Sequence, residues 1–316
     1  MNTDKIMIKK YFQGYVDSEW KDGYINLYRF SSCQRDFYAK EGNWFGLMSQ
    51  CMAGILIKIK EFKKLAFDFC VFNSASEKNT RFDILYGKEK MEQLSFTSPK
   101  GRAEFQVNGE DVKVYFPYDQ LVGVKNIEIE GEPVTRTKKI IWSFGDSITQ
   151  GFDLNCPSLA YPAHLGRVFE AEVFNFGVGG YYIRKGILND VDILQKPWII
   201  TFSYGCNDWR ENQDYKKEMS EVFKALRNYC PETPIFVILP ITKADEEEKK
   251  LNGTLEDVRS NIAKEAEKYP HMYVIHCGRN VNVDLHLCED GTHPNDRGMK
   301  FLAENVQKEL RIEKVT

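Results

Sequence analysis

A serine follows the first strongly apolar run in the second half of the chain. Residues 140–144 lead into Gly145, Asp146 and Ser147, so a strand ending there would present the Ser147 hydroxyl in a sharp turn before a helix. A serine hydroxyl is a weak nucleophile that needs a neighbouring base, and a helix N-terminus favours developing negative charge. The same residue types also suit a serine that only caps a helix. The motif alone therefore allows either a nucleophile or a cap.

A possible base and its partner lie directly before the last predicted helix. Asp290 and His293 are three residues apart and are followed by Pro294. A histidine, with an ordinary pKa near 6.5, can accept a serine proton, and a carboxylate can orient the ring through its Nδ1 hydrogen. Such general base catalysis contributes about 10² to 10⁴ in rate. By itself, the pair also fits an N-capping aspartate beside a surface histidine.

Two further segments could donate hydrogen bonds to an oxyanion. Residues 175–180 are rich in glycine, which lets a backbone N–H approach a ligand, and residues 205–208 include Asn207, whose side-chain amide can donate. Losing one such donor costs about 2.7 to 4 kcal/mol of transition-state stabilisation. A tight turn and a capping loop are the alternatives. Because all four motifs fall at expected loop positions around one sheet, together they favour a shared site for acyl transfer.

The second half of the chain has the pattern of a parallel sheet covered on both faces. Apolar, β-branched runs alternate there with segments of helical period. The runs are 140–144, 172–176, 198–202, 235–239 and 273–276. Thr254 and Asp257 have the capping-box spacing at the start of one predicted helix. We therefore predict a doubly wound, flavodoxin-like α/β domain with a five-stranded sheet, whose ligands bind at the carboxyl ends of the strands.

Up to about residue 132 the apolar pattern alternates with a period of two. Leu65 and Phe67 would face one way, and Ala66 and Asp68 the other. Similar short strands are predicted at 24–30, 53–60, 81–86, 103–107, 111–116 and 124–129, with a turn at Asn108 and Gly109. With no convincing helix between them, these strands predict an all-β sandwich or jelly roll. The predicted domains are residues 1–132 and 133–316.

Composition excludes several classes of protein. The 316 residues carry 43 Lys and Arg against 46 Asp and Glu, a net charge of -3, so we expect no nucleic-acid partner. No apolar run approaches the roughly 20 residues that a membrane helix needs. The lysine-containing start at residues 1–10 is not followed by the apolar run of a secretory signal, so a cytoplasmic location is expected. The eight cysteines lack CxxC pairs and fit reduced, structural thiols.

In order and rough spacing, the four motifs resemble those of the SGNH (GDSL-type) hydrolases, over roughly residues 138–312. The resemblance implies a nucleophilic serine, a His–Asp pair that activates it and an oxyanion hole. The residues it assigns are Ser147 as nucleophile, Asp290 and His293 as the rest of the triad, and Gly180 and Asn207 as oxyanion donors beside the Ser147 N–H. Gly179 is an alternative to Gly180, because loop geometry decides between adjacent glycines.

The N-terminal half resembles the β-sandwich that precedes the SGNH domain in some bacterial carbohydrate esterases. That resemblance implies deacetylation of a sugar or glycan fragment, whereas the triad implies only hydrolysis of an ester or thioester. Trp209 and Arg210 directly follow the third motif and could bind substrate, with the indole stacking on a sugar ring. The alternative for Trp209 is simple packing.

We therefore predict a serine esterase that removes a short acyl group, most simply acetyl, from a carbohydrate or related alcohol through an acyl-enzyme. The alternatives are a thioesterase or acyl transferase acting on a larger acyl group, and an inactive glycan-binding protein. The expected partner is a small-molecule or oligosaccharide ester, with no cofactor and no metal. The sequence leaves the oligomeric state open.

Overall fold

The computed structural model describes residues 3–76, 78–87 and 90–312. The chain divides into two compact units. The N-terminal unit contains Met1–Thr137 and Cys156–Ser158, and the C-terminal unit contains Lys138–Asn155 and Leu159–Thr316. Among the described residues, no helix has the length and apolar character needed to cross a membrane.

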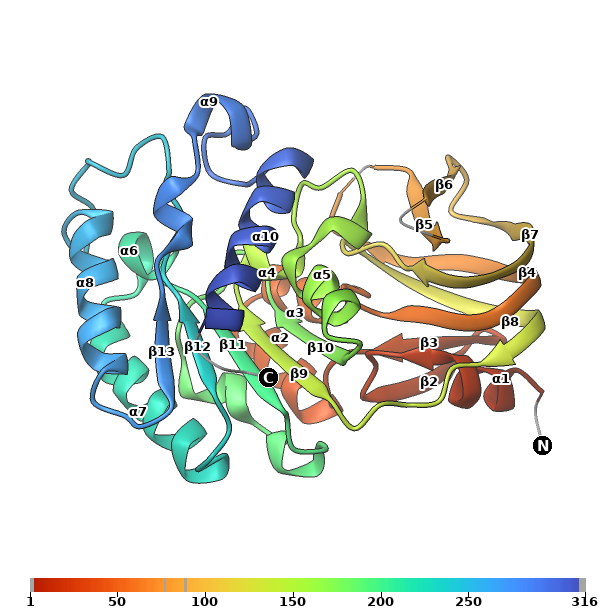
Figure 1. Cartoon of the computed structure of the whole chain (residues 1–316), viewed down its shortest axis with the longest axis horizontal. Helices are drawn as coiled ribbons and strands as arrows, with labels where there is room; N and C mark the ends of the chain where they lie inside the picture. The colour runs from red at the N-terminus through yellow and green to blue at the C-terminus, as the bar shows by residue number, and fades with distance from the viewer. Residues whose placement is uncertain (1–2, 77, 88–89, 313–316) are drawn as a thin grey trace. The chain divides into compact units, whose positions relative to one another are not determined.

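The N-terminal unit is built on an antiparallel sheet of eight strands (Figure 1). Its strands are β1 (Phe12–Gln13), β2 (Asp17–Lys21), β3 (Tyr24–Tyr28), β4 (Leu56–Ser74), β5 (Thr80–Tyr86), β6 (Lys90–Phe96), β7 (Lys100–Tyr115) and β8 (Gln120–Pro133). The order is β2-β3-β8-β4-β7-β5-β6, with β1 paired to β4. The pairing of the long strand β4 with β7 and β8 shifts register at several points, and such bulges bend a sheet.

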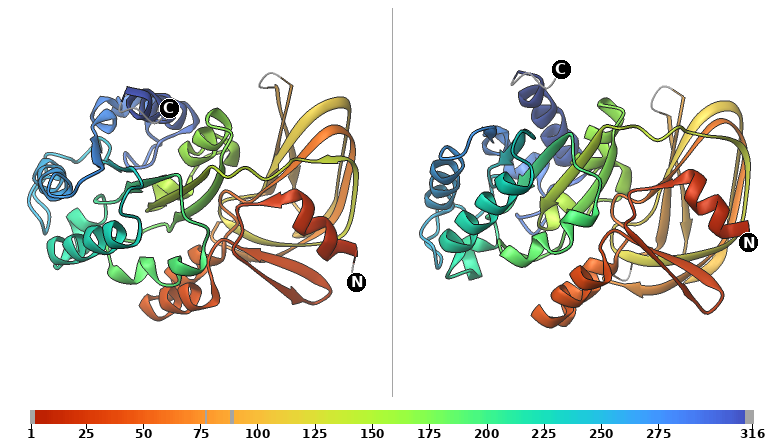
Figure 2. Two further views of the ribbon diagram at one scale, coloured as in Figure 1. Left: turned by 60° about the horizontal axis from the view of Figure 1, so that its bottom comes forward. Right: turned by 90° about the horizontal axis from the view of Figure 1, so that it is seen from below.

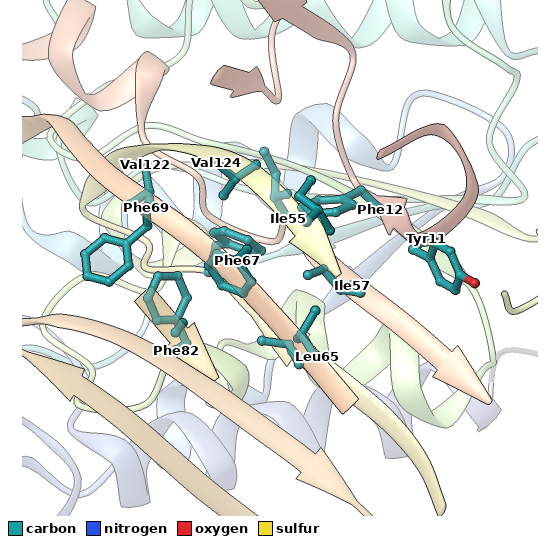
Figure 3. Close-up of a cluster of buried hydrophobic side chains, with 14 of the residues drawn as sticks. Tyr11, Phe12, Ile55, Ile57, Leu65, Phe67, Phe69, Phe82, Val122 and Val124 are labelled. Carbon is teal, nitrogen blue, oxygen red and sulfur yellow. The ribbon is translucent and has the colours of Figure 1, made fainter. Parts of the chain in front are cut away.

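Aromatic rings pack among aliphatic side chains in the core of this unit (Figure 3). Leu65, Phe67 and Phe69 of β4 are at most 2% exposed, as predicted for the core face, but Ala66 on the opposite face is also 0% exposed, so this part of the strand is buried on more than the one predicted face. The Phe67 ring lies 5.3 Å from that of Phe82 in an edge-to-face contact and 5.8 Å from that of Phe116 in a stacked one. Such ring pairs stabilise a core by about 0.5 to 1.5 kcal/mol beyond the area they bury.

The N-terminal unit also contains three helices, so the prediction that this half has none was wrong. They are α1 (Thr3–Tyr11), α2 (Ser32–Glu41) and α3 (Asn43–Gln50). Helix α2 starts with a capping box, in which the Ser31 hydroxyl accepts from the Gln34 N–H and the Gln34 side chain accepts from the Ser31 N–H. These two hydrogen bonds satisfy N–H groups that a helix start leaves without partners.

The predicted turn at Asn108 and Gly109 is also wrong. The single strand β7 runs through both residues. Opposite them, the pairing with β4 shifts between Phe62, which pairs with Glu110, and Lys64, which pairs with Gln106. Gly109 has a φ of 79°. Because glycine adopts positive φ without strain, it accommodates a bulge here instead of a hairpin turn.

The C-terminal unit confirms the predicted doubly wound fold. Its five parallel strands are β9 (Ile140–Gly145), β10 (Glu172–Gly177), β11 (Ile199–Ser203), β12 (Ile235–Ile238) and β13 (Met272–Ile275). They pair in the order β10-β9-β11-β12-β13, the flavodoxin-like arrangement that reverses direction beside β9. Each strand coincides with a predicted apolar run, because residues of a sheet covered on both faces are buried on both sides.

Helices cover both faces of this sheet (Figure 2). The helices are α4 (Ser147–Gln150), α5 (Tyr161–Val168), α6 (Asp208–Glu211), α7 (Tyr215–Tyr229), α8 (Leu255–Ala266), α9 (Val283–His286) and α10 (Asp296–Ile312). Helix α5 packs against α10, and α7 packs against α8 on the other face. The capping box predicted from Thr254 and Asp257 is confirmed at the start of α8.

Candidate active site

Strand register brings the first three motifs to one edge of the sheet. Gly145, the last residue of β9, pairs with Gly177 of β10 on one side and with Ser203 of β11 on the other. Ser147 follows Gly145 by two residues, and Asn207 follows Ser203 by four. The segments after β9, β10 and β11 therefore start next to one another at the carboxyl end of the sheet.

A sharp turn places Ser147 at the start of α4. Asp146 caps the helix, with its Oδ1 accepting the Ile148 N–H at 3.0 Å. Gly145 must lack a side chain, because a Cβ there would collide with the Thr149 side chain and lie 2.6 Å from the Ser203 carbonyl oxygen. The local packing therefore fixes the turn that carries the serine.

Ser147, His293 and Asp290 form a hydrogen-bonded chain. His293 Nε2 lies 2.8 Å from Ser147 Oγ, and His293 Nδ1 lies 2.6 Å from Asp290 Oδ2. The carboxylate favours the tautomer with hydrogen on Nδ1, which leaves Nε2 to accept the serine hydroxyl hydrogen. The order of contacts is that of a triad in which a serine is activated by a histidine held by an aspartate.

The loop around Asp290 holds its carboxylate ionised. Burial raises the pKa of this carboxyl. Hydrogen bonds from the His293 and Thr292 N–H groups, at 3.0 and 2.9 Å, and the nearby His293 imidazole lower the pKa by more than burial raises it, so the pKa lies below its ordinary value. Both backbone bonds go to Oδ1, and the imidazole takes Oδ2. The carboxylate thus stays charged where it orients the ring.

The N–H groups of Gly179 and Gly180, in the loop after β10, differ in their hydrogen bonding. The Gly179 N–H donates to Gln150 Oε1 at 2.7 Å. Within the described structure, the backbone N–H groups of Gly180 and Ser147 have no hydrogen-bond acceptor. Gly180 has a φ of 79°, a conformation that glycine adopts without strain. In this region of the described structure, the N–H groups of Gly180 and Ser147 are therefore available to a ligand.

Asn207 lies at the start of α6 and is partly exposed. Its Nδ2 donates to the Tyr181 carbonyl oxygen at 2.9 Å. An amide nitrogen carries two hydrogens, and in the described part of the chain the second one has no acceptor. The bond to Tyr181 fixes the amide and leaves its remaining hydrogen for a ligand.

Two buried carboxyls flank these residues. Burial raises the pKa of Asp208 to about 7, although its carboxylate accepts from Asn212 Nδ2 and from the Ile183 N–H. Burial also raises the pKa of Asp146, an effect that the Ile148 N–H and the Lys243 ammonium oppose. Lys243 is itself only 3% exposed. Asp146, Asp208 and Lys243 are therefore buried charged groups that interact electrostatically, Asp146 with each of the other two.

Cys206 precedes Asn207 but does not suit nucleophilic chemistry. Burial raises the pKa of its thiol to about 11. Since the thiolate is the reactive form of cysteine, this residue is inert near neutral pH.

Trp209 and Arg210 do not join the hydrogen-bonded chain around Ser147. Trp209 is 0% exposed, and its indole N–H donates to the Gly253 carbonyl oxygen at 2.8 Å. Both faces of the ring are inside the fold, so this conformation offers no surface for a sugar. Arg210 pairs with Asp245 at 2.8 Å and is about one third exposed.

Sequence reasoning missed Gln150, Asp153 and Lys243. Gln150 holds Gly179, and Asp153 Oδ2 lies 3.3 Å from His293 Nδ1. Both residues follow Ser147 closely in the chain, but no periodic or motif signal marks them. Lys243 lies in the loop after β12, and its place beside Asp146 arises only when the strands assemble.

One group of side chains at the site has donor atoms close enough to hold a metal ion. Oxygen atoms of Asp153 and Asp290 and a ring nitrogen of His293 lie within 4.8 Å of one another. A metal bound to Nδ1 would replace the hydrogen that Asp290 accepts. Metal binding here would therefore break the hydrogen bond between His293 Nδ1 and Asp290 Oδ2.

Solved structures share the fold of the whole chain. The salicylyl-acyltransferase SsfX3 from a tetracycline biosynthetic pathway has a TM-score of 0.80 at 18% identity, covering 96% of this chain and 94% of that one. A family two carbohydrate esterase from Clostridium thermocellum has a TM-score of 0.64 at 12% identity, covering 83% and 93%. A family two carbohydrate esterase from Cellvibrio japonicus has a TM-score of 0.63 at 15% identity, covering 96% and 95%.

Comparison of the sequence with family profiles identifies the family of the chain. No curated protein sequence matches the chain. The profile of the GDSL-like lipase/acylhydrolase family matches residues 143–301, half of the chain, and this span contains all four motifs. The match therefore includes the serine turn and the histidine loop together. The chain belongs to the GDSL-like lipase/acylhydrolase family, and its C-terminal unit is an ester hydrolase domain of that family.

Proposed function

We propose that the protein is a serine esterase that removes a short acyl group, specifically acetyl, from a carbohydrate or related alcohol. The observation that carries this proposal is the chain of contacts from Ser147 Oγ to His293 Nε2 at 2.8 Å and from His293 Nδ1 to Asp290 Oδ2 at 2.6 Å. This is the geometry that lets a neutral serine lose its proton as it attacks a carbonyl.

In the acylation step, Ser147 Oγ attacks the ester carbonyl carbon while its proton moves to His293 Nε2. The carbonyl oxygen becomes an oxyanion, which the N–H groups of Ser147 and Gly180 and the Asn207 amide bind. Collapse of this intermediate breaks the bond to the alcohol oxygen, which takes the proton from Nε2. The products are a free alcohol and an acyl-serine.

In the deacylation step, water takes the place of the alcohol. His293 accepts a proton from this water as its oxygen attacks the acyl carbon, and the same donors bind the second oxyanion. Collapse returns the proton to Ser147 Oγ and releases the carboxylic acid. Asp290 stabilises the imidazolium in both steps and is not itself protonated.

A carbohydrate-ester substrate is supported by the likeness in fold to carbohydrate esterases. The family two carbohydrate esterases from Clostridium thermocellum and Cellvibrio japonicus cover most of this chain, including its N-terminal β-rich unit. An acetyl xylan esterase from Butyrivibrio proteoclasticus also has this fold, with a TM-score of 0.57 at 13% identity. We infer the acetyl group and the sugar alcohol by analogy with these proteins.

A transferase or thioesterase acting on a larger acyl group is the second candidate. It is favoured by the likeness to the salicylyl-acyltransferase, which has a TM-score of 0.80. In a transferase, an acceptor alcohol would replace water in the deacylation step. The third candidate, an inactive glycan-binding protein, is disfavoured because every position of the triad and oxyanion site is filled.

Two assays test the proposal. 4-Nitrophenyl esters of increasing acyl length should be hydrolysed fastest as the acetate, and acetylated sugars and polysaccharides should release acetate. A preference for long acyl chains, or product formed only when an acceptor alcohol is added, would contradict the acetylesterase assignment. The Ser147→Ala variant serves as the matched control in each assay.

We further propose that residues 1–132 and 133–316 are the functional domains, the second of which performs hydrolysis. A cytoplasmic location stays a prediction, which fractionation of cells that express the protein would test. The catalytic roles of Ser147, Gly180, Asn207, Asp290 and His293 are likewise proposals.

A further inference from the structure

His293 faces a second carboxylate. Its Nδ1 lies 3.3 Å from Asp153 Oδ2, in addition to the 2.6 Å contact with Asp290 Oδ2. The two aspartate side chains are 33% and 42% exposed, so neither is fully screened by water. A carboxylate this close to an imidazole ring favours the protonated ring. An imidazolium formed during catalysis would therefore have two negative neighbours.

The chain holds Asp153 from both sides. Before it, the N–H groups of residues 151 and 152 donate to the Ser147 carbonyl oxygen at 3.0 and 2.9 Å. After it, the Asn155 N–H donates to Asp296 Oδ1, at the first residue of α10, at 2.9 Å. Asp153 has a φ of 66°, which aspartate tolerates better than most residues with a side chain. The backbone on either side of Asp153 is thus tied both to the helix of Ser147 and to the last helix.

Phe152 adds a second contact from the same segment. Its ring centroid lies 5.3 Å from that of His293, with the two planes tilted by 48°. Phe152 packs against the ring while Asp153 approaches its Nδ1 edge. The segment after α4 therefore contacts the imidazole through two consecutive residues.

Charged groups near the ring come from four parts of the chain. Asp290 lies on the loop of His293 itself, Asp153 lies after α4, and Asp146 acts on the ring through space from the start of α4. Lys243, after β12, offsets part of the charge of Asp146. Of these groups, Asp153 and Asp290 have oxygens within 4 Å of Nδ1.

We propose that Asp153 is a positioning residue for His293, sharing with Asp290 the orientation of the ring and the stabilisation of the imidazolium. When the charge of Asp290 is removed, the Nδ1 hydrogen turns to Asp153 Oδ2. This inference rests on the proposed function, because it assumes that His293 is the base for Ser147. It predicts that loss of Asp290 alone is milder than in a triad with a single carboxylate, where the corresponding Asn substitution lowers kcat by about 10⁴.

The test is a double-mutant cycle on the full chain with 4-nitrophenyl acetate. We expect Asp153→Asn to lower kcat about threefold to tenfold, the effect of a partly exposed charge. Asp290→Asn should lower kcat by about 10² rather than 10⁴, and the double variant should fall at least about tenfold below Asp290→Asn. In Asp153→Asn, the acid limb of the pH–rate profile should move to lower pH, because the imidazolium loses a stabilising charge.

Two further variants separate charge from folding. Asp153→Gly removes the carboxylate but tolerates the positive φ, so it should match Asp153→Asn in kcat and in pH profile. Asp190→Asn replaces another aspartate of positive φ in the same unit, with a φ of 54°, and should leave both unchanged. Thermal unfolding of each variant shows whether the fold is kept.

Equal activity of the Asp290→Asn and double variants, or an unmoved acid limb in both Asp153 variants, would overturn the role of Asp153. The proposed function is judged separately, by the wild-type protein and Ser147→Ala. If the wild type hydrolyses the ester through Ser147 and the Asp153 variants behave like the wild type, only the positioning role fails.

Discussion

The Gly179 N–H is held by the side chain of Gln150, at 2.7 Å from Oε1. Gln150 is the last residue of α4, the short helix that begins with Ser147. The loop after β10 is therefore attached directly to the helix that carries the serine. Because Gly179 is occupied, the adjacent Gly180 N–H is the group available to an oxyanion.

This link predicts the effect of Gln150→Ala. Without the glutamine oxygen, the Gly179 N–H loses its acceptor and the Gly180 N–H is less well fixed. We expect a roughly tenfold lower kcat with little change in KM, and a loss of about 1 kcal/mol in the free energy of unfolding. Steady-state kinetics and urea unfolding measure the two effects. A variant with altered KM and unchanged kcat would contradict this role.

Asn207→Ala should act on the transition state. Loss of one oxyanion donor lowers kcat by about 10² to 10³. Asn252→Ala is a matched control, since the Asn252 amide donates to the backbone carbonyls of Asp208 and Asn212 and should affect stability more than kcat. If the two variants lost kcat equally, Asn207 would have only a structural role.

Because the pKa of Asp208 is raised, we expect the free energy of unfolding to depend on pH. Its pKa is raised from 3.8 to about 7 by burial. Between these values the folded state keeps a proton that the unfolded state has lost, so the free energy of unfolding should fall as pH rises from about 4 to about 7 and then level off. The full span corresponds to on the order of 4 kcal/mol. Urea unfolding at several pH values should show a flatter dependence in Asp208→Asn than in the wild type; equal slopes would contradict the assignment.

Trp209 should matter for stability and not for substrate affinity. Trp209→Phe removes the hydrogen bond to Gly253 and some buried area, so it should lower the free energy of unfolding by about 1 to 3 kcal/mol. KM for acetylated sugars should stay within about twofold of the wild type, because the ring is buried. A large rise in KM with unchanged stability would restore a role in sugar binding.

The C-terminal sheet could be predicted because its strands are buried on both faces. Such strands appear as continuous apolar runs, as in Ile235–Ile238, and each motif follows a strand or precedes the last helix. Helix α2 escaped prediction because it buries few side chains and has no apolar stripe. Its capping box, Ser31 with Gln34, was the local signal that could have revealed it.

Only the site residues that lie in local sequence motifs could be predicted from the sequence. Ser147, Asp290 and His293 stand in recognisable sequence contexts, and the structure places them within hydrogen-bond distance, while their roles stay predictions. Asp153 and Lys243 could not be found in this way. Each lies in a loop whose position is set only by the assembled fold. Neither stands in a sequence pattern that indicates which residue it contacts.

Covalent labelling with a fluorophosphonate probe, followed by mass spectrometry of the digested protein, tests the central claim most directly. We expect one phosphonylated residue, Ser147, with labelling abolished in Ser147→Ala and strongly slowed in His293→Ala. A folded wild-type protein that hydrolyses the ester but is labelled at another residue, or at none, would contradict the assignment of Ser147 as the nucleophile.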